Sequence, residues 1–403
     1  MIGNPPYVES RNDCFSEELK DKLQTHMTEI YGNQANKYFP RGADLLIFFF
    51  ELSLRLITPK GINTLITQNS WLSSDYGKKF QNYILLHTDI LCIFDSDFKY
   101  FENANINTVI TFFRGKNFGK KVTYVKSHEN VEKECFSITN GNKLYKATDI
   151  KTFISTDILL SEYKWGFLFF SDSIFINLLA KAEKKGSKLS KNDNGFSIGQ
   201  GINTTKDNLS FNKRVGYSPI FSKEDGAVYK WQNAKVFVNN SIISNDRKKP
   251  VLIMPRGIGN RYYCAYNSLN GYSASCVDIY SKKKDFNSVL QLWLFCNSSF
   301  CWLMRENSGR KNLGGGMLKA EATDMKLMPL LYNFEINGAV RNLFETANKI
   351  EISTDIRNTL DNPFHKRIDD IVSSYLCFTE TEKKYITEKL ISEIKARNNK
   401  SRN

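Results

Sequence analysis

The chain has 403 residues, of which 41% are hydrophobic and 24% charged, so we expect a globular protein of two or three domains. This composition excludes a collagen-like or disordered chain, and no apolar run is long enough to cross a membrane. The N-terminus lacks the basic and apolar segments of an export signal, so we expect a cytoplasmic protein. Its eight scattered cysteines form no CxxC pair and its four histidines no HExxH pattern, which predicts reduced thiols and no metal site.

Positive charge is concentrated in the middle of the chain, although the formal net charge of +14 describes the whole. Residues 116–330 hold 33 of the 56 Lys and Arg but only 18 of the 42 Asp and Glu, whereas residues 1–115 and 331–403 are nearly neutral. A general excess of lysine would spread over all three segments. The pattern therefore predicts a surface that faces a polyanion, with nucleic acid favoured over an acidic membrane or protein surface.

The first 115 residues predict helices and strands in the order of an α/β domain. Ser16 precedes two glutamates as a helix N-cap, and residues 43–57 form a helix that is apolar nearly all round, which is typical of a helix inside a core. After the break at Pro59-Lys60-Gly61 come a strand over 62–67, a helix over 75–87, and strands over 89–94 and 108–113. This order is typical of the second half of a doubly wound sheet.

The amino-acid composition of the sequence changes after residue 115. Gly, Asn, Lys and Ser become more frequent and the strands short, which predicts an irregular α+β domain over 116–330. Glycine clusters at 199–201 and 314–316 follow no obvious buried strand, so neither is assigned as a cofactor site. A helical pattern returns at 363–372 and 380–396, and it predicts a C-terminal helical segment over 331–403.

The chain opens with Gly3-Asn4-Pro5-Pro6-Tyr7, a loop that two prolines make rigid. The Asn4 side chain offers one acceptor, and the Pro5 carbonyl offers a second whose direction the following ring fixes. Two such acceptors beside an aromatic ring suit the exocyclic amine of a nucleobase. Hydrogen bonds from both amine hydrogens localise the nitrogen lone pair and make it nucleophilic. The base must first leave the duplex, and Tyr7 can then stack on it.

This loop also resembles a known catalytic motif. Asn4-Pro5-Pro6-Tyr7 after a small residue is similar to the motif of DNA amino-methyltransferases, above all of the adenine-N6 enzymes. The chain resembles type IIG and gamma-class restriction-modification enzymes, with their TaqI-like specificity domain and helical tail, over nearly its whole length. The segments that carry this resemblance are 44–56, 59–72, 101–109, 199–204, 297–300, 312–316 and 368–380.

The resemblance implies a site-specific adenine DNA methyltransferase that moves a methyl group from S-adenosylmethionine to N6 of a flipped adenine in double-stranded DNA. Asn4 and the Pro5 carbonyl would accept from the target amine, Pro6 would hold the loop, and Tyr7 would stack on the base. Phe101 is expected on the opposite face of the base. Phe98 is the alternative because spacing in that loop is loose, and ordinary core packing stays open as the role of these rings.

One departure from the family concerns the cofactor. The family carries its glycine-rich S-adenosylmethionine loop on a βαβ unit ahead of the Asn-Pro-Pro-Tyr motif, and this chain begins at the motif. We therefore expect a truncated polypeptide, a sheet with an open edge and a bare face, and an N-terminal half-chain as the partner that carries the cofactor-binding motif. The alternative is a non-catalytic DNA-binding specificity module, or an inactive remnant of a split enzyme.

Basic residues of the middle segment are the candidates for contact with DNA phosphates. Arg256, in the turn Pro255-Arg256-Gly257, can also present its guanidinium to a base edge. For any single candidate, a solvated surface charge is the alternative. The candidates are Lys206, Lys213, Arg214, Arg256, Arg261, Arg310, Lys311 and Lys319.

Overall fold

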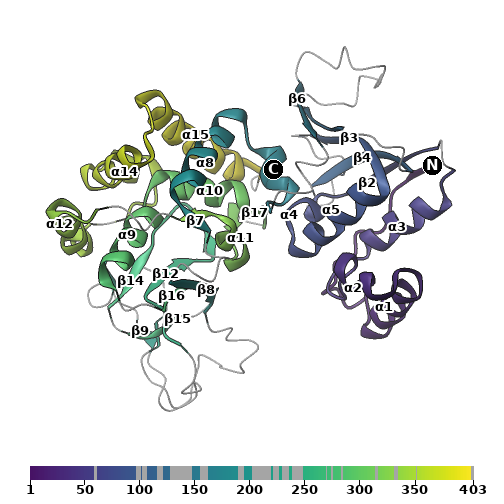
Figure 1. Cartoon of the computed structure of the whole chain (residues 1–403), viewed down its shortest axis with the longest axis horizontal. Helices are drawn as coiled ribbons and strands as arrows, with labels where there is room; N and C mark the ends of the chain where they lie inside the picture. Colours follow the sequence, from purple (N-terminus) through teal and green to yellow (C-terminus); the bar gives the residue numbers. More distant parts are fainter. Residues whose placement is uncertain are drawn as a thin grey trace. The chain divides into compact units, whose positions relative to one another are not determined.

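Two compact units, Met1–Phe170 and Ser171–Asn403, make up the fold, and each is described by itself (Figure 1). The structure is a computed structural model. Within its described residues, no helix combines the length and apolar character needed to cross a bilayer. It describes all residues except 59–60, 97–100, 102–106, 116–120, 128–147, 155–161, 189–194, 202–218, 221–226, 229–235, 238–247, 269, 274–275, 283–284, 314–315, 331–334, 351 and 401–403.

The first unit is a mixed α/β structure. Its strands are β1 (Ile2–Gly3), β2 (Ile62–Gln68), β3 (Thr88–Ser96), β4 (Thr108–Gly115), β5 (Lys121–Ser127) and β6 (Thr148–Ile154). Its helices are α1 (Glu17–Tyr31), α2 (Ala35–Tyr38), α3 (Leu46–Leu56), α4 (Ser70–Ser73), α5 (Asp75–His87) and α7 (Trp165–Phe170). The helices and strands predicted within the first 115 residues are confirmed, including the N-cap of α1, where Ser16 Oγ accepts from the Leu19 amide.

The sheet of this unit has the order β1-β2-β4-β3-β5-β6. Strand β1 runs parallel to β2, and β3 runs parallel to β5, whereas β4 is antiparallel to both of its neighbours. Residues 97–107 join β3 to β4, and they are too few for the helical crossover that parallel strands require. The sheet is therefore mixed, and its antiparallel strand is a feature that the predicted doubly wound pattern did not include.

The helices of the first unit pack on one face of this sheet. Phe50 of α3, Phe80 of α5 and Trp165 of α7 share a buried core with Leu65 of β2 and Phe113 of β4. The Phe50 ring lies 5.3 Å from the Phe80 ring and 5.4 Å from the Phe113 ring, between centroids. Alternation along β2 and β4 turns every second side chain to this core.

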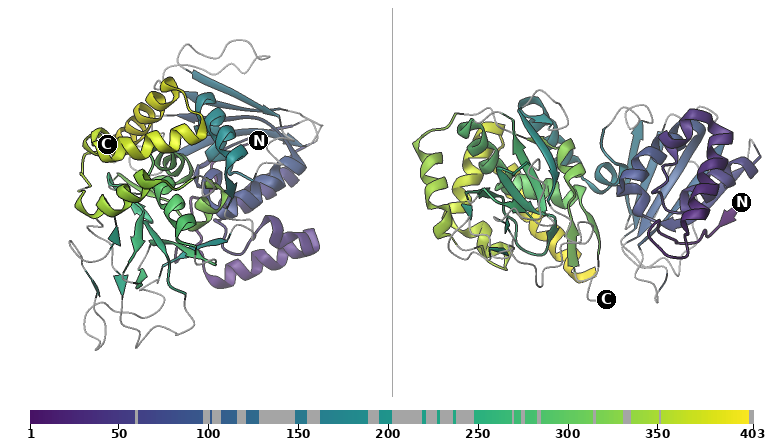
Figure 2. Two further views of the ribbon diagram at one scale, coloured as in Figure 1. Left: turned by 60° about the vertical axis from the view of Figure 1, so that its left-hand side comes forward. Right: turned by 90° about the horizontal axis from the view of Figure 1, so that it is seen from below.

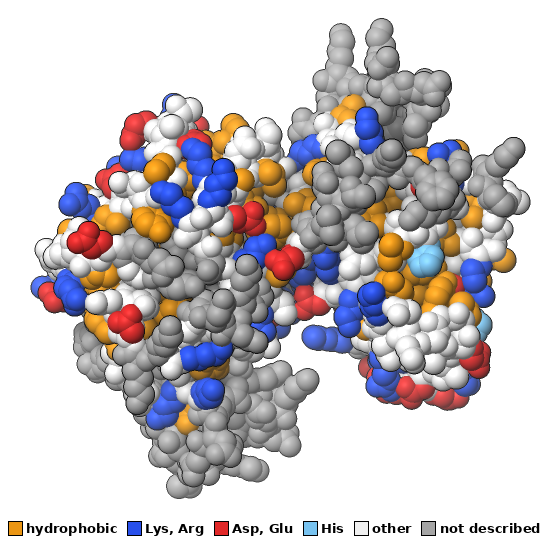
Figure 3. Space-filling model, viewed as in Figure 1, with side chains coloured by type: hydrophobic (Ala, Val, Ile, Leu, Met, Phe, Trp, Pro, Cys, Tyr) orange, Lys and Arg blue, Asp and Glu red, His pale blue; other side chains and the backbone are white. Residues whose placement is uncertain are grey.

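The other face and one edge of the sheet are less covered within the described residues. Ile110 and Phe112 of β4 are only partly buried on the second face. Strand β1 lies at the edge of the sheet, where Ile2 is 88% exposed. Helix α3, which the sequence predicted inside a core, exposes Leu52 and, to 62%, Leu56. Hydrophobic side chains also reach the surface of this unit in Figure 3.

The second unit combines short strands with longer helices. Its strands are β7 (Ser187–Lys188), β8 (Phe196–Gln200), β9 (Pro219–Ile220), β10 (Ala227–Val228), β11 (Val236–Phe237), β12 (Leu252–Pro255), β13 (Gly257–Ile258), β14 (Ala265–Asn267), β15 (Tyr272–Ser273), β16 (Cys276–Ser281), β17 (Arg310–Leu313), β18 (Met317–Lys319) and β19 (Pro329–Leu330). Its helices are α8 (Ser173–Lys185), α9 (Phe286–Cys296), α10 (Ser299–Ser308), α11 (Ala322–Leu327), α12 (Gly338–Thr346), α13 (Ile356–Asp361), α14 (Pro363–Leu376) and α15 (Glu380–Lys400).

A five-stranded sheet of the order β10-β14-β12-β16-β8 and a small sheet of the order β13-β18-β17 carry the central part of this unit. Helices α9 and α10 are buried along most of their length. These two helices were not predicted from the sequence, because a helix buried on all sides shows no amphipathic stripe. The predicted C-terminal helices are confirmed as α14 and α15, drawn in yellow in Figure 2.

The two compact units do not follow the predicted boundaries at residues 115 and 331. Strands β5 and β6 extend the first sheet beyond residue 115. In the second unit, Arg397 of α15 and Glu306 of α10 are both fully buried and lie 2.9 Å apart, Nη2 to Oε1. The C-terminal helices therefore share a core with the segment before them. As divisions of function, the ranges 1–115, 116–330 and 331–403 stay predictions.

Candidate functional site

The Asn4–Tyr7 loop lies at the carboxyl end of β1. The Met1 amino group donates to the Ile62 carbonyl over 2.7 Å, and the Thr64 amide donates to the Met1 carbonyl over 2.9 Å, so β1 is fixed to β2. Because β1 and β2 are parallel, the loop after β1 and the turn after β2 open at the same edge of the sheet. Ligands of open α/β sheets bind at this edge.

Neither acceptor of the loop is engaged by a described residue. The Asn4 side chain is exposed, whereas Pro5 is buried and anchors the loop to the unit. Within the described residues, no donor forms a hydrogen bond with the Asn4 side chain or with the Pro5 carbonyl. A planar donor group that bound to these two acceptors would therefore displace no hydrogen bond of the described residues.

Tyr7 and Phe101 lie close together although the chain separates them widely. Their ring centroids are 6.0 Å apart at an interplanar angle of 67°, an edge-to-face contact. The Tyr7 hydroxyl donates to the Ile66 carbonyl over 3.3 Å, and burial raises the pKa of Tyr7 to about 12, so the phenol stays neutral. A base stacked between the rings would have to separate them, and this role stays a prediction. The alternative, Phe98, lies outside the described residues.

Asp44 connects the end of the loop to α4 and α5 through hydrogen bonds, and this role was not predicted from the sequence. Its Oδ1 accepts from the Ser10 amide over 3.0 Å, and its Oδ2 accepts from the Tyr76 hydroxyl over 2.5 Å and the Ser70 hydroxyl over 3.4 Å. Burial raises the pKa of Asp44, and the hydrogen bonds from Tyr76 and Ser10 oppose this rise. An acidic residue just before an apolar helix suggests an N-cap, but this carboxylate turns to the loop instead.

The strand ends beside the loop are joined by the backbone. The Asn69 amide, after β2, donates to the Asn107 carbonyl, before β4, over 2.9 Å. The loop between β3 and β4, which contains Phe101, therefore begins and ends at the edge where β1 and β2 end. The structure thus collects the Asn4–Tyr7 loop, Phe101 and the Asp44 tie at one edge of the first unit.

Three of the predicted DNA contacts meet in the second unit around one carboxylate, Glu321. Arg256 donates to both Glu321 oxygens, with Nε over 2.7 Å and Nη2 over 2.9 Å. Arg310 Nη2 lies 3.2 Å and Lys319 Nζ 3.1 Å from Glu321 Oε1. Burial alone would raise the pKa of Glu321, but the hydrogen bonds from Arg256 and Lys319 outweigh it and lower the pKa to about 2. The signal in the sequence was limited to two acids, Glu321 and Asp324, close together in a basic segment.

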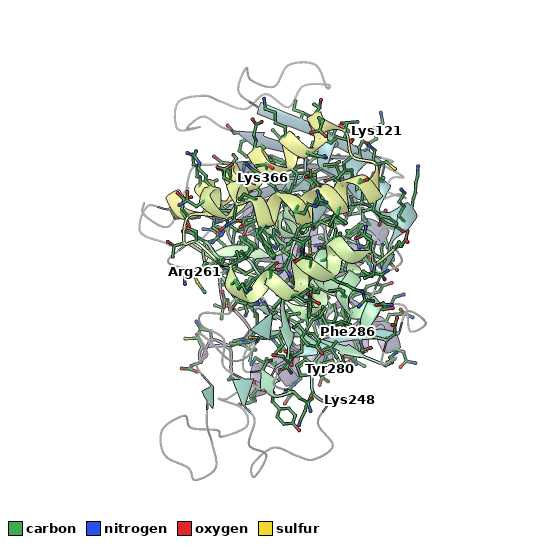
Figure 4. The ribbon with its side chains drawn as sticks, turned by 90° about the vertical axis from the view of Figure 1, so that its left-hand side faces the viewer. Lys121, Lys248, Arg261, Tyr280, Phe286 and Lys366 are labelled. Atoms are coloured by element: carbon green, nitrogen blue, oxygen red, sulfur yellow. The ribbon has the colours of Figure 1, made fainter. Side chains whose placement is uncertain are left out.

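The remaining candidates do not join this cluster. Lys311 Nζ lies 2.6 Å from Glu393 Oε2 and links β17 to α15. Arg261 is partly buried and lies at the margin of the second unit in Figure 4, well away from the labelled Tyr280. Lys206, Lys213 and Arg214 lie outside the described residues. The contact of every candidate with DNA stays a prediction.

The described residues do not form a cradle for a nucleotide cofactor. The glycines at 199–201 end β8, which pairs with β16. A Cβ added at Gly201 would lie 2.2 Å from the Ser273 hydroxyl. Glycine is therefore needed here because the backbone passes close to Ser273. Gly314 and Gly315 lie outside the described residues. The glycine cluster that the structure describes therefore does not fit S-adenosylmethionine.

Comparisons with known proteins agree on one class. Residues 1–101, which contain the Asn4–Tyr7 loop and Phe101, match the family described as Eco57I restriction-modification methylase. The Type II methyltransferase M.BstVI of Geobacillus stearothermophilus is 26% identical over 173 residues, which are 41% of this chain and 29% of that protein. Family match and relative together support a restriction-modification methylase.

One solved structure extends the likeness of fold to the whole chain. The Type IIL restriction-modification enzyme MmeI, solved in complex with DNA, matches 100% of this chain and 57% of its own at 12% identity, with a TM-score of 0.50. The type IIG restriction endonuclease BpuSI matches 100% of this chain and 55% of its own at 13% identity, with a TM-score of 0.42. The chain thus spans little more than half the length of these enzymes and less than a third of M.BstVI.

Proposed function

We propose that this chain is the catalytic and target-recognition part of a DNA methyltransferase of a restriction-modification system, which methylates N6 of adenine. The observation that carries the proposal is the loop itself. An exposed Asn4 and a rigid Pro5 carbonyl stand at the ligand-binding edge of the sheet, inside the segment that matches a methylase family. The partly exposed ring of Tyr7 lies beside them, with Phe101 in contact.

The residues of the chain act on the base in three ways. Asn4 Oδ1 and the Pro5 carbonyl accept the two amine hydrogens, which localises the lone pair on the nitrogen. Tyr7 and Phe101 hold the extruded ring by stacking, which is worth about 1–3 kcal/mol per base. The Asp44 tie keeps the loop in place, because Ser10 follows Tyr7 closely in the chain. S-adenosylmethionine supplies the methyl group in a methyltransferase.

Cofactor binding is assigned in this proposal to a segment that the described residues do not include. We place an N-terminal half-chain with the cofactor-binding motif at the open β1 edge of the first unit. Backbone groups at an open edge can pair with another strand, and the exposed Ile2, Leu52 and Leu56 supply an apolar surface beside it. The resemblance of the loop to adenine-N6 enzymes, rather than the geometry alone, selects adenine over cytosine.

The test is a methyl-transfer assay with the chain reconstituted with that half-chain. Tritium from labelled S-adenosylmethionine should enter DNA and elute as N6-methyladenine after digestion. Asn4→Ala should abolish transfer and keep DNA binding, whereas Asn342→Ala, at an exposed asparagine of α12, should change neither. Tyr7→Ala should weaken both transfer and binding. Transfer by Asn4→Ala at the parental rate would refute the chemical assignment.

A non-catalytic specificity module is the second candidate, and the concentration of positive charge in residues 116–330 favours it equally. Sequence-selective DNA binding without any methyl transfer, in the reconstituted complex, would support this candidate instead. Steep loss of affinity with salt is expected under both, at about 0.9 log units per neutralised phosphate for each tenfold rise in salt.

A further inference from the structure

The cluster around Glu321 is built from four separate elements of the second unit. Arg256 stands between β12 and β13, Arg310 begins β17, Lys319 ends β18, and Glu321 directly precedes α11. The pairing of Gly257 and of Arg310 with Lys319 holds these strands in register. The Ala320 amide donates to the Arg256 carbonyl over 2.9 Å, which fixes the backbone beside both side chains.

Positively charged side chains outnumber carboxylates in this cluster. Three cations face the Glu321 carboxylate, and the buried Asp324 carboxylate accepts from the Glu321 amide beside it, so one positive charge remains. The Gln200 side-chain amide also donates to Glu321, over 3.1 Å, and adds no charge. The carboxylate itself is only 16% exposed, whereas the side chain of Arg310 is 41% exposed. An ion pair that served stability alone would gain nothing from the surplus, because like charges repel. The surplus suits an anionic ligand that approaches from solvent.

Arg256 differs from its two neighbours in geometry. Its Nε and Nη2 form a two-pronged contact with Glu321, which fixes the plane of the guanidinium. Two of its five N–H donors are engaged in this way, and no described residue accepts from Nη1. The side chain remains 25% exposed. An orientated planar donor with an unused edge matches the O6 and N7 acceptors that guanine presents in the major groove.

We propose that Arg256 reads a guanine of the DNA target sequence, and that Glu321 is the positioning residue that orientates it. Arg310 and Lys319 each touch Glu321 through one nitrogen only, and they contact the flanking phosphates. This assignment rests on the proposed function, since it names how the same chain selects its DNA. Fixing Arg256 before binding lowers the entropy cost of the bidentate base contact.

The test is selection of bound sequences from a random duplex pool by the full chain, followed by salt titrations on the selected site. Arg256→Lys keeps the charge and removes the planar fork, so preference for guanine at one position should fall about tenfold or more while the salt slope stays unchanged. Glu321→Gln should relax the same position without lowering affinity for other sequences. Arg310→Gln and Lys319→Gln should each lower the salt slope by about one and leave base preference intact.

Arg341→Lys is the matched control, because Arg341 is exposed on α12 and its side chain donates to Asn287 only, within the described residues. It should change neither sequence preference nor salt slope. An unchanged guanine preference in Arg256→Lys and Glu321→Gln, both folded by circular dichroism, would overturn the inference. An equal loss of affinity for all sequences in Arg256→Gln, with a lower salt slope, would make it a phosphate contact and overturn it too. A parental chain that binds no DNA would refute the proposed function itself.

Discussion

Removal of the Asp44 carboxylate tests how the candidate site is held together. The hydrogen bond from the Tyr76 hydroxyl is short at 2.5 Å, the one from the Ser10 amide has the ordinary length of 3.0 Å, and the third, from Ser70 at 3.4 Å, is weak. A hydrogen bond to a charged group contributes about 1.5–3 kcal/mol, and burial of the carboxylate offsets part of this sum. We expect Asp44→Ala to lower the free energy of unfolding of the first unit by about 2–4 kcal/mol.

Asp44→Asn removes the negative charge of the side chain and keeps its shape. An asparagine can still accept from the Ser10 amide and donate to the Tyr76 hydroxyl, so we expect a loss of about 1 kcal/mol. The pKa of Asp44 is raised in the folded protein, so the folded state binds this proton more readily than the unfolded state. Its contribution to stability therefore falls as the pH rises from 3.8 through the folded pKa, and Asp44→Asn should lack this part of the pH dependence.

The assay is urea unfolding, combined with hydrogen exchange of peptides from residues 1–57 to separate a local change from a global one. Asp21→Asn is the control, since Asp21 pairs with Arg41 at the exposed surface and should cost less than about 0.5 kcal/mol. Tyr76→Phe completes a double-mutant cycle, in which we expect a coupling of about 1–2 kcal/mol with Asp44→Ala. Strict additivity, or a loss in Asp44→Ala no larger than in the control, would refute the reasoning.

Two further predictions concern the C-terminal helix α15. Arg397→Ala should lower the free energy of unfolding of the second unit by about 3–5 kcal/mol in denaturant titrations, because it removes the buried guanidinium that pairs with Glu306 and leaves this carboxylate with the Tyr262 hydroxyl and with Lys311 at 3.8 Å. A loss below about 1 kcal/mol would contradict this. Burial alone would raise the pKa of Glu393, but Lys311 and Lys389 lower it to about 2, so its stabilisation is complete above pH 4.5 and is lost as the pH falls toward 2. At about 1.4 kcal/mol per unit, this stabilisation amounts to about 3.5 kcal/mol at most, of which about 2 kcal/mol is lost between pH 7 and pH 3. Glu393→Gln should remove this part from the difference in stability between the two pH values, and an unchanged difference would contradict the assignment.

Local sequence was sufficient where one residue pattern decides an element by itself. The alternation in residues 62–67 predicted β2, and Ser16 before two glutamates predicted the start of α1. The prolines of the Asn4–Tyr7 loop predicted a rigid turn with two acceptors, and the structure places that turn at the carboxyl end of β1. These signals depend on neighbouring residues only, so they can be read without the fold.

Helices α9 and α10 show where local patterns fail. Their residues are buried on nearly every side, so no polar stripe marks a helical period. The antiparallel β4 is a similar case, since the strand pattern is the same for either direction and only the short connection from β3 decides it.

For the candidate site, too, the sequence determined some features and the tertiary structure determined others. The residue types at Asn4, Tyr7 and Arg256 determined which chemistry the chain can offer, because acceptors, rings and guanidinium donors are properties of single side chains. The roles of Asp44 and Glu321 came only with the tertiary structure, which brought their partners from distant parts of the chain. A carboxylate acts through what surrounds it, and its surroundings are assembled by long-range pairing of strands and packing of helices, which single-residue chemistry does not contain.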